Sequence, residues 1–120
     1  MYNTTPIAEF IGELLKDCRL AVLATEGNGQ PHVSLIAVTP FRGFREMIFA
    51  TYRNTLKFEN LSLNGRVAVL IQDERKDSPG RNTISVLTAY GHAAEIGAPE
   101  LEEAANVHRE RHPDLAALLQ

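Results

Sequence analysis

Cysteine is scarce in this chain, with Cys18 alone among 120 residues. A single thiol excludes an intramolecular disulfide and a zinc site made of several cysteines, and it fits a reducing compartment. Long hydrophobic runs are also absent, because no stretch approaches the roughly 20 apolar residues of a membrane span. The first residues lack a basic segment followed by an apolar one. We therefore expect a cytoplasmic protein that does not bind a membrane.

Neither sign of charge dominates the composition. The formal net charge is -3, which argues against nucleic acid as the main partner. With 44% hydrophobic and 22% charged residues, the chain has the composition of a globular protein. Domains usually hold roughly 100–200 residues, so we expect residues 1–120 to form a single domain. Its core must be modest, and a large ligand is therefore expected in a surface cleft or at a subunit interface.

The first half of the chain shows a helix followed by strands that tight turns connect. Apolar residues at helical spacing predict a helix over residues 6–17. Strands are predicted over residues 20–25 and 31–39, with a hairpin turn at Asn28-Gly29 between them. A third strand is predicted over residues 46–51. Short strands with tight turns indicate a mainly β fold with flanking helices, arranged as a small barrel.

The second half begins with a predicted helix over residues 55–63, which ends where an Asn-Gly pair follows. Residues 66–72 lack alternation and predict a strand buried on both faces. The next ten residues, 73–82, are rich in charge and contain Pro-Gly, so they predict a loop or a mobile flap. A last strand is predicted over residues 83–95.

The C-terminal part is predicted to be helical. Pro99 suits the start of a helix, and His112-Pro113 suits its end. The sequence then finishes on the apolar side chains of Leu115, Leu118 and Leu119. Two alternatives follow: either the barrel closes without a further C-terminal strand, or a partner subunit covers these leucines.

A cluster of cations and hydroxyls lies where a predicted strand leads into a predicted helix. Arg53 and Lys57 are one helical turn apart, with Thr51 and Thr55 beside them. The unpaired N–H groups and the positive dipole end of the helix start point the same way. Such a set suits a phosphate dianion. Because the preceding strand, around residues 30–36, can lie against a flat ring, flavin mononucleotide (FMN) is the first candidate ligand.

The four histidines do not predict a metal site. His108 and His112 are four residues apart, a spacing that can bind a metal, but the flanking residues supply no third ligand. We expect both to lie on an exposed helix face. His32 and His92 stay open as structural or functional residues. No catalytic acid or base is assigned, since a flavin carries its own redox chemistry.

Several segments carry a family resemblance in their order and spacing, namely residues 20–25, 27–34, 49–61, 66–71 and 73–75. In this order the chain resembles the pyridoxamine 5′-phosphate oxidase-like family of FMN-binding split barrels. The resemblance covers roughly residues 7–96. It implies an FMN-binding split β-barrel, and it implies a homodimer with FMN sites at the subunit interface.

The resemblance also implies which residues hold the cofactor. The phosphate would lie at the strand–helix junction and the flavin ring along the second strand. The cofactor-binding residues are then Ser34, Leu35, Ile36, Ala37, Ala50, Thr51, Arg53, Thr55 and Lys57. Arg75, in the predicted charged loop, is a further candidate to close over an anionic group of a ligand.

The function implied is that of an FMN-dependent oxidoreductase acting on a small or planar substrate, with a nicotinamide cofactor as one candidate reductant. Pyridoxamine phosphate is not the expected substrate, because Ser34 and Thr39 stand where the name-giving oxidase carries basic residues. Two alternatives stay open. One is an FMN-based electron carrier or redox sensor, and the other is a binding module for heme or a deazaflavin.

Overall fold

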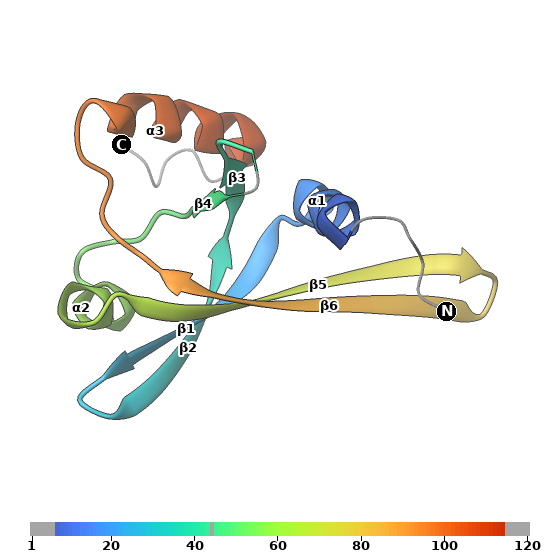
Figure 1. Cartoon of the computed structure of the whole chain (residues 1–120), viewed down its shortest axis with the longest axis horizontal. Helices are drawn as coiled ribbons and strands as arrows, with labels where there is room; N and C mark the ends of the chain where they lie inside the picture. Colours follow the sequence, from blue (N-terminus) through green and yellow to red (C-terminus); the bar gives the residue numbers. More distant parts are fainter. Residues whose placement is uncertain (1–6, 44, 115–120) are drawn as a thin grey trace.

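The chain folds into two antiparallel sheets and three helices within the part that the structure describes, residues 7–43 and 45–114, with the backbone alone described for 7–10 and 75–78. Figure 1 shows this computed structural model. The elements in chain order are α1 (Ile7–Asp17), β1 (Leu20–Gly27), β2 (Gln30–Ala37), β3 (Thr39–Phe41), β4 (Glu46–Ile48), α2 (Leu56–Leu63), β5 (Arg66–Ser78), β6 (Arg81–His92) and α3 (Glu100–Arg111).

The larger sheet has the strand order β2-β1-β5-β6, and β3 pairs with β4 in a smaller one. Asn28 and Gly29 have φ angles of 53° and 83°, which are the left-handed values that a two-residue hairpin turn requires. The predicted turn is therefore confirmed. β1 pairs on both sides, whereas β2 and β6 are edge strands and the sheet does not close on itself. The fold is a split β-barrel with flanking helices rather than a closed barrel.

The predicted loop over residues 73–82 is wrong, because these residues continue β5 and β6. The two strands pair without a break from Arg66↔His92 to Lys76↔Asn82, and after one irregularity Ser78 pairs with Arg81. Pro79 and Gly80 alone form the turn, where Gly80 takes a φ of 79°. A two-stranded ribbon leaves its side chains largely in water, so the charges that indicated a loop are compatible with strand pairing.

Three other strand predictions needed shorter bounds, and among them the strand predicted over residues 83–95 ends at His92. The strand predicted over residues 31–39 breaks at Val38, whose backbone N–H bonds the carbonyl of Arg19 at 3.0 Å before the chain turns away to pair as β3. The strand predicted over residues 46–51 ends at Ile48. Nor is β5 buried on both faces: Ile71 is fully buried, but its neighbour Leu70 is 39% exposed.

The core has two parts. The larger part lies between α1 and one face of the main sheet, and it contains Leu14, Leu15, Ala21, Leu23, Ile36, Val38 and Ile71. The smaller part lies under α3, where Ala104 packs against Phe41 and Ile48 of the β3–β4 pair. Among the described residues, no helix is both long and apolar enough to cross a membrane.

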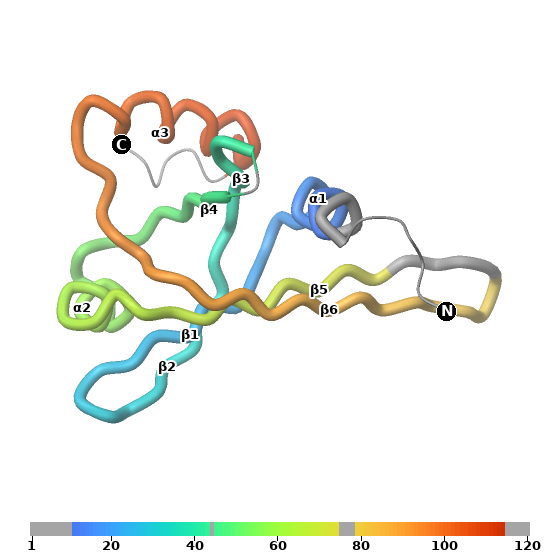
Figure 2. Tube along the Cα trace, in the orientation of Figure 1, coloured from blue at the N-terminus to red at the C-terminus, as the bar shows by residue number. Residues whose placement is uncertain are grey.

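Arg111 fastens α3 to the end of α1. After β6 the chain crosses over to place α3 beside β3 and β4 (Figure 2). The guanidinium of Arg111 then donates to the carbonyls of Leu15 (3.1 Å), Lys16 (2.8 Å) and Cys18, and to that of Val38 (3.2 Å). Carbonyls at a helix C-terminus lack partners within the helix and attract a cation. One side chain thereby fixes where the inner face of α3 meets the sheet.

Candidate functional site

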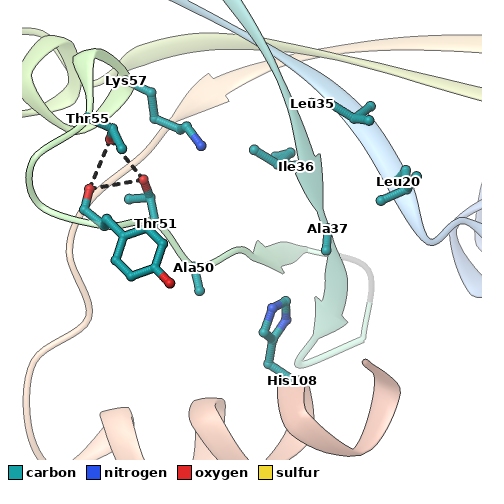
Figure 3. Close-up of a pocket in the computed structure, with 10 residues that line it drawn as sticks. Leu20, Leu35, Ile36, Ala37, Ala50, Thr51, Thr55, Lys57 and His108 are labelled. Atoms are coloured by element: carbon teal, nitrogen blue, oxygen red, sulfur yellow. Dashed lines mark hydrogen bonds between the residues drawn. The ribbon is translucent and has the colours of Figure 1, made fainter. Parts of the chain in front are cut away.

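A cleft of about 260 Å³ opens between the start of α2, the second strand and α3 (Figure 3). Its walls come from five separate parts of the chain. The lining residues are Leu20, Leu35, Ile36, Ala37, Ala50, Thr51, Tyr52, Thr55, Lys57 and His108. Seven of the nine predicted cofactor-binding residues are thus brought together around one space: Leu35, Ile36, Ala37, Ala50, Thr51, Thr55 and Lys57.

The α2 wall is polar and organised around Thr55. This residue caps α2, since its hydroxyl accepts the N–H of Phe58 at 3.2 Å. The same hydroxyl lies 3.0 Å from that of Thr51 and donates to the carbonyl of Tyr52 at 2.9 Å. Lys57 lies in the first turn of α2, and its amine points into the space between α2 and β2 (Figure 3). Hydroxyls, a helix N-terminus and a cation therefore face the cleft together.

The β2 wall consists of the three consecutive residues Leu35, Ile36 and Ala37. Side chains alternate between the faces of a strand, so a surface lined by consecutive residues is made by the strand's edge. β2 is an edge strand of the sheet. Alternate N–H and C=O groups along its outer side therefore have no sheet partner, and they could bond the polar rim of a flat ligand.

Two predicted residues do not reach the cleft. Arg53 turns away, since its guanidinium is 2.6 Å from a carboxylate oxygen of Glu95 and 5.4 Å from the ring centre of Phe58. Ser34 lies on β2, but its hydroxyl is buried and has no partner within the described part of the chain. The side chain of Arg75 lies outside the described residues. Among the side chains that the structure describes, Lys57 is thus the lysine or arginine that lines the cleft.

The prediction of two exposed histidines on α3 is wrong, since His108 is 4% and His112 1% exposed. His112 Nε2 lies 2.7 Å from the carbonyl of Val38, so it must be the donor. His108 Nδ1 lies 2.7 Å from the hydroxyl of Thr39. Helical spacing placed both rings on one face of α3, but only the packing of α3 on β3 shows that this face is the inner one.

Three lining residues were not predicted to belong to the site: Leu20, Tyr52 and His108. Of these, His108 is the residue that the sequence had placed on an exposed helix face. Its pKa lies below the ordinary histidine value, mainly because burial disfavours the charged ring and also because of the charges of His112 and Arg111. The sequence signal available for His108 was its spacing of four residues from His112, which places both rings on one helix face. His92 is exposed, His32 is partly buried, and neither lines the cleft. The described residues contain no cluster of ligands for a metal ion.

The fold and cleft define the class of protein as a split β-barrel with a cleft beside its second strand. Residues 7–118 match the family model described as pyridoxamine 5′-phosphate oxidase. Because this match spans nearly the whole chain, the chain belongs to the pyridoxamine 5′-phosphate oxidase family.

Solved structures share this fold. Atu2129 of Agrobacterium tumefaciens, of unknown function, has a TM-score of 0.80 at 22% identity, over 100% of this chain and 52% of that one. Rv2991 of Mycobacterium tuberculosis, a conserved hypothetical protein, has a TM-score of 0.67 at 27% identity, and the match covers 93% of this chain and 65% of that one. A heme-binding protein of Mycobacterium smegmatis has a TM-score of 0.81 at 18% identity, and the match covers 97% of this chain and 47% of that one. This chain therefore spans about half the length of the first and third. No curated protein matches it significantly.

Proposed function

We propose that the protein binds FMN in this cleft. The observation that carries the proposal is the meeting of two unlike walls in one space: Lys57, Thr51 and Thr55 on the α2 side, and the free edge of β2 at residues 35–37 on the other. The first wall suits a phosphate, because charge-assisted bonds from a cation and hydroxyls act beside a helix N-terminus. The second wall suits the polar rim of a flat ring.

The residues present fit the cofactor in chemistry, while the volume suggests that one chain encloses only part of it. Small-molecule sites usually measure roughly 300–1,000 Å³. The cleft of about 260 Å³ lies below that range, and two of its apolar walls stand open, with Leu20 53% and Leu35 64% exposed. The phosphate and one side of the ring would be held by this chain, and the remainder would need another cover.

A second copy of the chain would supply that cover in a homodimer. The sheet face opposite α1 carries large exposed apolar residues on three of its four strands, β2, β5 and β6: Val33, Leu35, Leu70, Ile84, Val86 and Tyr90. Contiguous exposed apolar surface marks an interaction site. Leu35 belongs both to this face and to the cleft. Pairing through the face would therefore bury it and cover the cleft in the same step.

The proposed activity is that of an oxidoreductase with a small or planar substrate. Bound FMN would supply hydride or electron transfer at its ring. The chain's own residues would anchor the phosphate, orient the ring against β2 and leave an apolar space bounded by Ala37 and Ala50. A nicotinamide cofactor is a candidate reductant in this scheme. An electron carrier or redox sensor would use the same binding site without turning over a substrate.

Heme binding is the second candidate, and a deazaflavin is a related one. Two observations favour heme: a neighbour of the same fold is described as heme-binding, and His108, a potential axial ligand, lines the cleft. Lys57 would serve a heme propionate as well as a phosphate. The absorption spectrum separates these ligands, because a bound heme gives a Soret band and a bound flavin does not.

The decisive experiment compares FMN with riboflavin, which lacks the phosphate, in the wild type and in Lys57→Ala. We expect the wild type to retain FMN in molar amount and to prefer it to riboflavin. Lys57→Ala should weaken FMN binding by about 1.5–3 kcal/mol, the contribution of a charge-assisted bond, and leave riboflavin binding nearly unchanged.

Arg53→Ala is the matched control, since it removes a neighbouring cation whose side chain is held by Glu95. Its effect on FMN affinity should be smaller than that of Lys57→Ala. A wild-type protein that binds neither flavin would refute the proposal. Equal losses of FMN affinity in the two variants would refute the assignment of the phosphate to Lys57.

A further inference from the structure

The pair formed by Thr39 and His108 lies at the α3 wall of the cleft. The ring of His108 lies near Ala37, at one end of the β2 wall, and across the cleft from Lys57 (Figure 3). Thr39 is 2% and His108 4% exposed, and His108 still lines the cleft. Its ring points from α3 toward the space between Ala37 and Ala50 (Figure 3). Nδ1 is held by the hydroxyl of Thr39 at 2.7 Å. No described residue hydrogen-bonds the other ring nitrogen, Nε2, which is the atom left to meet a ligand.

The surroundings disfavour the charged form of this imidazole. The charged and titratable groups around His108 are His112 and Arg111 on its own helix, and Lys57 and Tyr52 elsewhere in the cleft lining. Burial and the neighbouring positive charges oppose protonation of the ring, so its pKa is lowered. A positively charged group of a ligand would be disfavoured beside His108 for the same reason.

The hydroxyl of Thr39 can either donate to Nδ1 or accept from it. If Thr39 donates, the neutral ring carries its proton on Nε2 and offers an N–H to the cleft. If Thr39 accepts, Nε2 offers a lone pair instead. Rotation of the hydroxyl, together with transfer of the ring proton from one nitrogen to the other, thus adapts the pair to a ligand acceptor or to a ligand donor, while the ring stays in place.

We infer that Nε2 of His108 hydrogen-bonds an uncharged polar group of the molecule held in the cleft. This inference rests on the proposed function, and it narrows the ligand's chemistry. The ligand would combine an anionic group for Lys57, a flat apolar part along residues 35–37, and a carbonyl, amide or ring N–H at the α3 wall. His108 is then a residue that determines specificity, and Thr39 positions it.

Two replacements at one position separate binding from structure. Asparagine reaches only as far as Nδ1, so His108→Asn can keep the bond to Thr39 but loses the atom that meets the ligand. Glutamine reaches about as far as Nε2, so His108→Gln can keep the ligand contact and loses the bond to Thr39. A purely structural histidine would tolerate asparagine better, and a ligand-binding one would tolerate glutamine better. His112→Asn is the matched control, because it removes a buried ring of α3 that lies outside the cleft lining.

The probes are FMN and riboflavin, with affinities measured from flavin fluorescence. We expect His108→Asn to weaken both by the same factor, roughly 2- to 12-fold for one neutral hydrogen bond. His108→Gln should lose less, and His112→Asn should keep wild-type affinity. The riboflavin affinity of the wild type should also change as the pH falls through the pKa of His108, falling if Nε2 accepts from a ligand N–H and rising if it donates to a ligand carbonyl, whereas the riboflavin affinity of His108→Asn should not change over that range.

The outcomes are separable from those that test Lys57. If His108→Asn binds both flavins as the wild type does, while Lys57→Ala loses the preference for FMN, the inference is overturned and the proposed function stands. If the wild type binds neither flavin, both are overturned. Should the His108 variants not fold, the ¹⁵N resonance of Nε2 in the wild type decides. It must shift when FMN is added, and an unchanged resonance overturns the inference.

Discussion

Replacing Arg111 by methionine should loosen α3 from the rest of the fold and disturb the α3 wall of the cleft. Methionine keeps the apolar stem and removes the guanidinium, which donates to four backbone carbonyls. A hydrogen bond to a charged group contributes about 1.5–3 kcal/mol. The four bonds share one partly exposed group, so their contributions do not add, and some carbonyls can bond water afterwards. We expect a loss of about 2–4 kcal/mol, against a total stability of about 5–15 kcal/mol for a native domain.

The assay is urea unfolding followed by circular dichroism at a fixed protein concentration. Arg109→Met is the control, because Arg109 lies on the same helix and its guanidinium bonds the exposed side chain of Asn106 at 2.8 Å. That variant should lose less than about 0.5 kcal/mol, as is usual for surface substitutions. Equal losses in the two variants would refute the view that Arg111 anchors α3. An anchored helix also predicts that Arg111→Met weakens flavin binding, since His108 would lose its fixed position.

Two further predictions concern pH and assembly. The pKa of His108 is lowered in the folded state, so its contribution to the free energy of unfolding should be fully present above about pH 6.5, the ordinary histidine value. This contribution should be lost as the pH falls through the lower folded-state pKa. Unfolding free energies of the wild type and His108→Asn at several pH values test this, and parallel curves would contradict it. Val86→Glu, on the exposed apolar sheet face, should convert a homodimer into monomers in sedimentation analysis, whereas Leu63→Glu, at an exposed leucine of α2, should not. A wild type that sediments as a monomer would remove the dimer from the proposal.

Local signals in the sequence were enough for most of the helices and for grouping the polar residues of the α2 wall of the cleft. The end of α2 follows from the Asn-Gly pair at residues 64–65, and the first hairpin follows from Asn28-Gly29, because both features act within a few residues. Thr51, Thr55 and Lys57 were recognised for the same reason: a strand leading into a helix brings neighbours in sequence together in space. The family's ordered motifs identified the split barrel.

The tertiary structure decided what depends on contacts between distant segments. Residues 73–82 are strand because β6 pairs with them, which charge composition cannot reveal. The side chain of Arg53 lies outside the cleft because it bonds Glu95, which is 42 residues away in the sequence. His108 lines the cleft because Arg111 docks α3 against the end of α1 and because the hydroxyl of Thr39, on β3, hydrogen-bonds the ring. Spacing along one element determines which side chains share a face, and only packing against another element determines whether that face is buried, solvated or turned toward a ligand.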